Sequence, residues 1–289
     1  MSSKLCVVEI KGGFGNQLFQ YNFANFLKIK GFNVKIDNYF YKTLKKQKGI
    51  TLRSEVFDPS LFNFKNISLF ERQLFKLLKK LNDSKKIKKY LPFFEDKYYR
   101  YYKDTNFNDK NIIEPYSHFD GYWQDIHYLK LEPDFVNESL MKLDVINKAK
   151  NTIPQENSFM LIVRRGDYVD MDQDLGLDFY EECFEKISKI SENPIINIFT
   201  DDIKWVEEND IFKNVSKIYG PKNEPQEVIE LFSEMLKNNH FFVCNSTFSF
   251  FAALIGKKIT SKIFVADPWF RNRNSKNLLF EDWIKIRNR

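Results

Sequence analysis

At 289 residues with 43% hydrophobic side chains, the chain is long enough for two modest hydrophobic cores, so two domains are expected. The formal net charge of +6 favours anionic partners, but it does not choose among sugar nucleotides, phospholipid headgroups and nucleic acid. The three cysteines are odd in number and widely spaced, which argues against a disulfide framework or a zinc site and fits a reducing cytoplasm. Residues 1–10 have no apolar core of signal length, and the most apolar stretch, residues 240–256, is interrupted by polar side chains, so neither a secretion signal nor a membrane span is expected.

The chain opens with a strand, a turn, a helix and a second strand. Apolar residues 5–10 predict the first strand, and the glycine-rich turn 12–17 leads into a helix. Gly31 is placed to end that helix, and residues 33–37 predict the next strand. The opening is therefore expected to be a βαβ unit.

Between residues 41 and 154 the pattern is irregular, apart from a helix expected near residues 70–81. Later in the chain, buried-looking strands alternate with amphipathic helices, which argues for a parallel sheet covered on both faces. We therefore expect an N-terminal domain of residues 1–154 and a C-terminal domain of residues 155–289. The C-terminal strands are expected at residues 159–163, 194–200, 215–219, 240–244 and 262–266. The helices between them are expected at residues 178–191, around 205, at 225–238 and from about 248.

Polar residues gather where four of these strands end. The clusters are residues 164–167, 201–202, 245–247 and 267–269. Because the carboxyl ends of parallel strands share one edge of an open sheet, and ligands bind outside that edge, the clusters are expected to line a single crevice. The arrangement indicates a nucleotide site.

Arg164 and Arg165 directly follow an apolar strand and precede Gly166 and Asp167. Adjacent side chains on extended backbone point to opposite sides, so one guanidinium can reach the crevice while the other braces the loop through Asp167. A fixed guanidinium fork suits a diphosphate and would stabilise the charge that develops as the diphosphate leaves. A structural Arg–Asp pair at a strand end explains the same residues equally well.

The turn Gly12–Gln17 lets a ligand approach backbone N–H groups at a helix N-terminus, where the helix dipole attracts anions. It has neither the glycine spacing of a dinucleotide fingerprint nor the Gly-Lys-Ser/Thr of a P-loop. By itself, a tight structural turn is the simpler interpretation. Asn16 and Gln17 favour a ligand, because polar side chains are costly at a buried helix start without a partner.

The segment Asn245–Ser249 joins a buried strand to an apolar helix, so its hydroxyls can cap that helix while its N–H groups face the crevice. Four small polar residues within it favour a cradle for phosphate or nucleobase over capping alone. Asp201 and Asp202 can hold a base edge or ribose, or cap the next helix, and a cap is the simpler interpretation for one of them. The three histidines are too dispersed for a metal cluster or a catalytic triad, and His240, which begins a strand, is expected to be structural.

Six short motifs occur in order along nearly the whole chain: Gly12–Tyr21, Asp120–Gln124, Arg164–Tyr168, Leu177–Tyr180, Phe199–Trp205 and Asn245–Ser249. In this order they resemble the bacterial α-1,2-fucosyltransferases of glycosyltransferase family 11. Each motif is weak by itself, and the ordered set is specific. The resemblance implies an α/β, GT-B-like fold of two Rossmann-like domains facing a central cleft, with the acceptor side in the N-terminal domain and GDP-sugar binding in the C-terminal domain.

The resemblance also implies an inverting glycosyltransferase that moves L-fucose from GDP-β-L-fucose to a galactose-type 2-hydroxyl of a glycan, in surface polysaccharide or O-antigen synthesis. No cofactor or metal is expected, and Asp201-Asp202 lacks the Asp-x-Asp form common in metal-dependent glycosyltransferases. The implied catalytic residues are Asn16 and Arg164. Arg164 would contact the β-phosphate of the leaving group, and the turn Gly13–Gln17, which contains Asn16, would approach the reacting sugar and the acceptor. The implied donor-binding residues are Gly13, Phe14, Gly15, Gln17, Arg165, Asp167, Asp201, Asp202, Asn245, Ser246, Thr247, Phe248 and Ser249.

One position departs from the family's pattern. Ile162 stands two residues before the first Arg, where these enzymes usually carry His, so altered donor choice and reduced activity are both alternatives. A general base for the acceptor hydroxyl is expected among Asp170, Asp172 and Asp174, and Asp172 is our choice. A solvated acidic loop explains the same three residues.

Between residues 71 and 89, eight basic residues face only two acids. The apolar residues that recur there at helical spacing, and are expected to face the core, are Phe70, Leu74, Leu77, Leu78 and Leu81. The lysines that would dock a cytoplasmic enzyme on anionic lipid at the inner face of the membrane, near a lipid-linked acceptor, are Lys85, Lys86, Lys88 and Lys89. A solvated helix face is an equally good interpretation. A nucleic-acid-binding module is not expected, because no recognition motif accompanies the basic patch.

Overall fold

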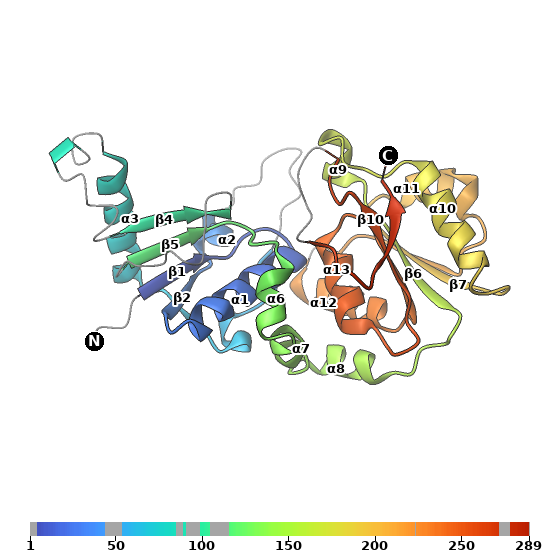
Figure 1. The fold of residues 1–289 in the computed structure, drawn as a ribbon, viewed down its shortest axis with the longest axis horizontal. Coiled ribbons are helices and arrows are strands. Elements are labelled where there is room, and N and C mark those ends of the chain that lie inside the picture. The colour runs from blue at the N-terminus through green and yellow to red at the C-terminus, as the bar shows by residue number, and fades with distance from the viewer. Residues whose placement is uncertain are drawn as a thin grey trace. The chain divides into compact units, whose positions relative to one another are not determined.

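The computed structural model folds into two compact α/β units (Figure 1). The first unit comprises Met1–Lys45 and Phe57–Ser139, and the second comprises Lys46–Val56 and Leu140–Arg289. α8 (Asp144–Asn151) packs on α12 (Pro225–Leu236) within the second unit, so by packing the chain divides ahead of α8, whereas the predicted boundary follows residue 154. The structure describes residues 5–43, 54–84, 89–90, 99–104, 116–222, 224–271 and 278–288.

The first unit contains a five-stranded parallel sheet in the order β3-β2-β1-β5-β4. Its strands are β1 (Leu5–Glu9), β2 (Asn33–Asp37), β3 (Lys65–Asn66), β4 (Arg100–Lys103) and β5 (Tyr116–Asp120). Its helices are α1 (Phe14–Ile29), α2 (Tyr39–Thr43), the 3-10 turn η1 (Pro59–Phe62), α3 (Leu69–Asp83), α6 (Ile126–Leu131) and α7 (Phe135–Leu140). β1, α1 and β2 confirm the predicted βαβ unit, whereas β4 and β5 lie in the stretch whose sequence pattern is irregular.

α1 is flanked by glycines and is buried along most of its length. Gly12 and Gly31 have φ values of 80° and 87°, in the left-handed region that glycine adopts without strain. The Gly31 N–H donates to the carbonyl of Lys28 at 2.9 Å, which ends the helix where the sequence predicts. Phe23 stacks on Trp123 with ring centroids 4.0 Å apart. Because all but one of residues 14–27 are buried, including the polar Gln17, Gln20, Asn22 and Asn25, α1 belongs to the core of the first unit.

α3 turns a different face to the core from the one its leucine spacing predicts. Phe75 is 2% exposed and clusters with Val7 and Tyr99. Phe70 and Leu77, which were expected in the core, are 79% and 52% exposed. The prediction of a core-facing stripe through these two residues is therefore wrong. The physical reason is that Phe75, outside the leucine stripe, fits among the aromatic rings on the sheet, and leucine spacing alone does not reveal that fit.

A capping box begins α3. The Ser68 hydroxyl accepts from the Glu71 N–H, and the Glu71 carboxylate accepts from the Ser68 N–H in return. Partial burial by itself would raise the pKa of Glu71, but hydrogen bonds from Lys35 and Ser68 outweigh it and lower the pKa to about 2. The first turn of α3 is therefore anchored to β2 through Lys35. The lysines at 85, 86 and 88 lie outside the described residues.

The second unit contains a six-stranded parallel sheet in the order β8-β7-β6-β9-β10-β11. The chain runs outward from β6 to β8 and then returns to β9 beside β6, which is the doubly wound order with a switch point between β6 and β9. Its strands are β6 (Ser158–Val163), β7 (Ile195–Thr200), β8 (Lys217–Tyr219), β9 (His240–Val243), β10 (Ile263–Asp267) and β11 (Ile284–Arg287). Its further helices are α9 (Gly166–Asp170), α10 (Leu177–Ser188), α11 (Ile203–Glu208), the 3-10 turn η4 (Asp210–Phe212) and α13 (Thr247–Gly256).

Two parallel-sheet units confirm the predicted α/β, GT-B-like class with two Rossmann-like domains, and the predicted strands of the second unit are confirmed with small shifts at their ends. β11 was not predicted, because it is a short edge strand with a single buried residue, Ile286. His240 is structural, as expected: its Nδ1 accepts from the Lys262 N–H at 3.0 Å, and burial lowers its pKa. In the described part of the chain, no helix combines the length and the apolar content needed to cross a bilayer.

The orientation of α3 predicts that removing a phenylalanine ring from its core face and from its exposed face has different effects on stability. Phe75→Ala is expected to lower the free energy of unfolding by about 3–5 kcal/mol, because it removes a buried ring and leaves a cavity. Phe70→Ala removes the same ring from the exposed face of the same helix and should change stability by less than about 0.5 kcal/mol. Urea unfolding of both variants measures the difference. Equal losses would show that Phe70 is also a core residue.

Candidate functional site

The switch point of the second unit brings together two clusters that are far apart in the sequence. The loop after β6 begins at Arg164, and the loop after β9 carries Asn245 into α13. The Tyr168 hydroxyl, one turn into α9, donates to the carbonyl of Asn245 at 2.8 Å. Ligands of doubly wound sheets bind outside the carboxyl ends of the strands at such a point. The predicted site residues of the second unit therefore meet where the topology favours a ligand.

Arg164 is held by two carboxylates. Its two terminal nitrogens donate to Asp201 and to Asp167, and its side chain is only 16% exposed. The sequence predicted that one arginine would reach the crevice while the other braced the loop through Asp167. In the structure the pair with Asp167 belongs to Arg164, the residue chosen for the crevice. An arginine has five N–H donors in a fixed fork, so the donors that face away from these aspartates can still serve an anion.

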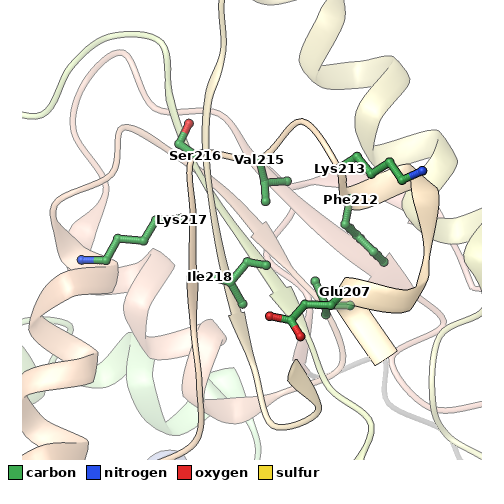
Figure 2. A pocket seen from close by; sticks show the side chains of 8 residues that line it. Glu207, Phe212, Lys213, Val215, Ser216, Lys217 and Ile218 are labelled. Carbon is green, nitrogen blue, oxygen red and sulfur yellow. The ribbon is translucent and has the colours of Figure 1, made fainter. Parts of the chain in front are cut away.

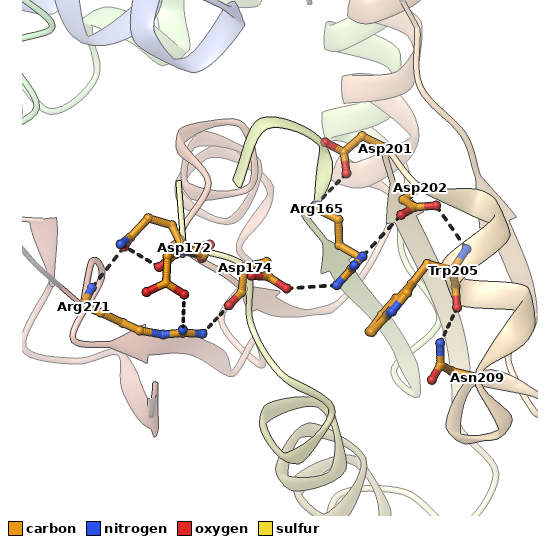
Figure 3. A network of polar contacts seen from close by, with 10 residues as sticks. Arg165, Asp172, Asp174, Asp201, Asp202, Trp205, Asn209 and Arg271 are labelled. Carbon is orange, nitrogen blue, oxygen red and sulfur yellow. Dashed lines mark hydrogen bonds and ion pairs between the residues drawn. The ribbon is translucent and has the colours of Figure 1, made fainter. Parts of the chain in front are cut away.

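Arg165 is braced on the other side of the loop (Figure 3). Its Nη1 lies 2.9 Å from Asp174, its Nε lies 3.3 Å from Asp202, and its guanidinium carbon lies 4.3 Å from the ring centre of Trp205. The two guanidiniums are thus matched against four carboxylates, at positions 167, 174, 201 and 202. Net charge at this edge does not by itself attract an anion, so recognition there must depend on geometry.

Asp201 and Asp202 are both engaged by protein donors. Asp202 caps α11 by accepting from the Trp205 N–H at 3.1 Å, which confirms the simpler of the two interpretations for one aspartate. Asp201 accepts from the Arg165 N–H at 2.8 Å as well as from the Arg164 side chain. The two aspartates therefore shape the loop after β6.

The start of α13 lacks the hydroxyl cap expected from the sequence. Ser246 occupies the N-cap position without a side-chain hydrogen bond to the helix, so that part of the prediction is wrong. The Asn245 amide instead donates to the carbonyl of Gln173 at 2.6 Å, and Ser249 donates back to the carbonyl of Ser246 at 2.9 Å. The first N–H groups of a helix have no partner within it and carry the positive end of its dipole. Phe248 was expected to bind the GDP-sugar donor. Its ring instead packs towards α12, with its centroid 5.6 Å from that of Phe232.

The loop that carries Asp172 is tied to the C-terminal part of the chain by Arg271 (Figure 3). The Arg271 guanidinium lies 3.5 Å from Asp172 and donates to the carbonyl of Asp174, and its N–H donates to Gln173 at 3.1 Å. Asp172 itself is 92% exposed on its side chain. The sequence did not reveal Arg271 or Gln173, because no motif marks them and they meet only in the folded chain.

The glycine-rich turn of the first unit satisfies its own polar groups. Gln17 donates to the carbonyl of Gly12 at 3.2 Å, and Gln124 donates to the Asn16 side chain at 2.7 Å. A Cβ on Gly12 would lie 2.8 Å from Asn16 and 2.9 Å from Tyr122, so the turn requires glycine. The buried Gln17 and the partly exposed Asn16 thus have protein partners, and their place at the helix start no longer implies a ligand. Of the other residues expected near the donor, Gly13 is the N-cap of α1, Gly15 is buried and Phe14 packs against Phe57.

A second polar cluster, which the sequence did not predict, lies at the same edge of the first unit. Lys11, just after β1, pairs with Asp120 at the end of β5, and Tyr101 donates to the same carboxylate. Burial alone would lower the pKa of Lys11 and raise that of Asp120, but their hydrogen bond and opposite charges outweigh burial and shift both pKa values the other way. In the sequence, the motif that begins at Asp120 was the signal that could have revealed this cluster. Tyr101 lies in the irregular stretch and gave none.

Figure 2 shows a hollow in the second unit of about 380 Å³, lined by α11, η4 and residues 215–218. These residues lead into the start of β8, whereas the arginines follow the carboxyl end of β6. The hollow therefore lies at the wrong end of the sheet for the candidate site. In the described ranges, no group of three His, Cys, Asp or Glu side chains is arranged to share a metal ion.

Comparison with known proteins gives this architecture a family. A family model for glycosyl transferase family 11 matches residues 5–287. The chain belongs to glycosyltransferase family 11. This family 11 glycosyltransferase is 28% identical to the O-antigen biosynthesis glycosyltransferase WbnK of Escherichia coli, over 96% of the chain and 99% of that protein. It is 24% identical to an α-1,2-colitosyltransferase of Escherichia coli, over 98% of the chain and 99% of that enzyme.

Two solved structures resemble this family 11 glycosyltransferase at low identity. A mutant of Arabidopsis thaliana FUT1 in complex with GDP has a TM-score of 0.45 and 12% identity, and the match covers 91% of this chain and 70% of that one. The α-1,6-fucosyltransferase NodZ soaked with GDP-fucose has a TM-score of 0.44 and 12% identity, and the match covers 88% of this chain and 92% of that one.

The contacts of Asp201 in this family 11 protein predict a structural cost when it is removed. Asp201→Ala should lower the free energy of unfolding by about 1–3 kcal/mol, because the half-buried Arg164 and the Arg165 N–H both lose a partner. Asp210→Ala removes an exposed carboxylate paired with Lys213 and should cost less than about 0.5 kcal/mol. Urea unfolding compares the two. A loss no larger for Asp201 than for Asp210 would mean that Asp201 does not brace the loop.

Proposed function

We propose that this glycosyltransferase moves L-fucose from GDP-β-L-fucose to a galactose-type 2-hydroxyl of a glycan, with inversion, in O-antigen or related surface polysaccharide synthesis. The observation that carries the proposal is the pairing, at the switch point of the second unit, of a braced arginine loop with the start of α13. The names of the two Escherichia coli relatives support the glycan acceptor and the linkage. The donor's diphosphate belongs at this edge of the sheet.

Two kinds of hydrogen-bonding group would hold the diphosphate of the GDP-sugar. The N–H groups at the start of α13 supply a positive dipole end, and the Arg164 guanidinium supplies a planar fork that matches two phosphate oxygens. Because Asp167 and Asp201 already neutralise that fork, the site gains its affinity from directed hydrogen bonds and the helix dipole. This favours a diphosphate of the right geometry over anions in general.

Transfer would proceed by attack of the acceptor hydroxyl on the anomeric carbon, from the side opposite the diphosphate. The bond from that carbon to the β-phosphate oxygen breaks, and negative charge grows on the departing GDP. Arg164 would stabilise that charge without moving, because its two aspartates fix it beforehand. The acceptor proton passes to a base, and Asp172 stays our prediction for it. The predicted roles of Asn16 and the Gly13–Gln17 turn at the reacting sugar also stay predictions.

We further propose that no metal takes part. The carboxylates nearest the proposed diphosphate position, Asp167, Asp201 and Asp202, all bind arginines. A divalent ion would have to displace those guanidiniums to use them. The stabilisation that a metal gives to a leaving diphosphate would come here from the directed hydrogen bonds of Arg164 and from the dipole at the start of α13.

A second candidate is transfer of a different sugar from a GDP donor, or a weakened activity. It is favoured by Ile162, which lies buried on β6 two residues before Arg164, where the resembling enzymes carry His. An isoleucine offers the donor no hydrogen bond, so a contact made by His would be lost. The relative named as a colitosyltransferase is consistent with variation in donor within the family.

One assay tests the donor and the metal together. The purified protein is given a β-galactoside acceptor with GDP-fucose or GDP-mannose, with and without EDTA, and products are followed by mass spectrometry and the linkage by NMR. We expect an α-1,2-fucosylated product at the same rate in EDTA. Transfer from GDP-mannose alone would replace the proposed donor. A loss of activity in EDTA that manganese or magnesium restores would overturn the metal-free mechanism.

Arg164 is the residue on which the mechanism depends most. Arg164→Ala is expected to lower kcat/KM by roughly 100- to 1000-fold, because preorganised stabilisation of the leaving group is lost. Arg164→Lys should also lower kcat/KM strongly, since the point charge of a lysine does not replace the two parallel N–H donors of the guanidinium. Arg287→Ala, at an exposed arginine on β11, is the matched control and should leave turnover unchanged. Near-normal turnover in Arg164→Ala would contradict the assignment of the site.

A further inference from the structure

We propose that one face of α3 is a membrane-docking surface that inserts apolar side chains at an anionic phospholipid interface. The surface, called here the α3 outer face, is the side of the helix turned away from Phe75. Its members are Leu69, Phe70, Leu74, Leu77 and Leu81, with Lys76 and Lys80 beside them. The inference does not depend on which sugar the enzyme transfers.

Large apolar side chains on the α3 outer face are exposed to an unusual degree. Leu69 is 78% exposed, Phe70 is 79% exposed and Leu77 is 52% exposed. Exposed apolar side chains scattered singly are normal on proteins, but neighbouring ones on one helix indicate an interaction surface. The capping box at Ser68 fixes the first turn, so Leu69 and Phe70 are presented on folded backbone.

The helical geometry joins Phe70 and Leu77 with Leu74 and Leu81 into one stripe, and places Leu69 beside the lysines. Successive residues of an α-helix are rotated by about 100°, so positions 70, 74, 77 and 81 fall on one side. Phe75 and Asn82, the buried residues of α3, lie about a third of a turn round the helix from this stripe. α3 therefore has two apolar faces. The core covers the one at Phe75, and Leu74 and Leu81 on the other are only partly covered.

Cations line the edge of this stripe. Lys80 lies about a quarter of a turn from the stripe and Lys76 about a third of a turn from it, and both are exposed. With Lys79, Asp83 and Ser84 they border a shallow groove of about 540 Å³ on the lysine side of the helix. Of the two acids on α3, Glu71 is paired with Lys35, so Asp83 alone is left to offset Lys76, Lys79 and Lys80. An apolar stripe bordered by lysines is the pattern of helices that lie in a membrane interface, where leucines and aromatic rings enter the acyl boundary and lysines meet lipid phosphates.

The same pattern argues against other occupants. A second copy of the chain docked on this stripe would bring Lys76 and Lys80 close to their own counterparts, and like charges oppose that contact. A polynucleotide would use the lysines but would leave Phe70 and Leu77 without an apolar partner, because aliphatic side chains gain little from phosphates. An anionic bilayer satisfies both kinds of side chain at once.

The test is vesicle co-sedimentation of the full chain. Phosphatidylcholine vesicles containing phosphatidylglycerol are expected to bind the protein, pure phosphatidylcholine vesicles should bind it weakly, and added salt should weaken the anionic binding. Lys76→Glu combined with Lys80→Glu should reduce binding by roughly 30-fold or more, since each lysine near an anionic surface contributes about 1 kcal/mol. Phe70→Ser combined with Leu77→Ser should reduce binding to both kinds of vesicle by at least about tenfold.

Matched controls come from exposed positions in the second unit. Ile153→Ser with Ile259→Ser removes two apolar side chains that are 92% and 105% exposed, and Lys189→Glu with Lys204→Glu makes the same change in charge. Both pairs should bind like the unchanged protein. Thermal unfolding checks that each variant is folded, and transfer to a water-soluble acceptor should be unaffected, which separates docking from catalysis.

Three outcomes would overturn the proposal. The first is equal binding to neutral and anionic vesicles in all proteins. The second is loss of binding in the control pairs as large as in the α3 pairs. The third is a dimer, measured by light scattering, that Phe70→Ser with Leu77→Ser converts to a monomer while vesicle binding stays unchanged, which would assign the α3 outer face to self-association.

Discussion

Parallel pairing of the strands is the constraint on which the rest of the molecule depends. Every strand within a unit runs in the same direction, so the loops that follow the strands gather at one edge of the sheet. In the second unit this edge receives Arg164 after β6, Asp201 after β7 and Asn245 before α13. The return of the chain from β8 to β9 leaves a switch point beside Arg164. A ligand site therefore arises from topology before any particular side chain is considered.

The chemistry at that edge rests on arginines that are fixed before a ligand arrives. Two carboxylates hold Arg164, and two more hold Arg165. Such bracing cancels net charge, but it also removes the cost of ordering a long side chain when the ligand binds. The proposed donor site thus combines weak attraction at long range with directed hydrogen bonds at short range. In the first unit, too, side chains hold the loops at the sheet edge in place. Gln17 and Gln20 donate to backbone carbonyls of the loops that follow β1 and β5.

α3 shows how one helix can serve two surroundings. Its core face packs around Phe75, and its outer face keeps Phe70 and Leu77 in contact with water. Exposed apolar area of this kind costs solubility, and a bilayer interface would recover that cost while also engaging the neighbouring lysines. A transferase whose acceptor is carried on a lipid would gain from such a surface, because the acceptor and the enzyme would then meet in two dimensions.

The sequence by itself determined whatever depends on neighbours along the chain. The alternation of apolar strands and amphipathic helices, the end of α1 at Gly31 and the cap of α11 by Asp202 all follow from local spacing and local hydrogen bonds. Tertiary structure alone decided which partner each polar group takes. In the folded chain Asp167 pairs with Arg164, and Ser246 makes no capping hydrogen bond. Arg271 bonds to Gln173, and Phe75 rather than Leu77 faces the core. The physical reason is that periodicity specifies a face of an element, whereas the partner of that face comes from a distant segment whose position only the folded sheet sets.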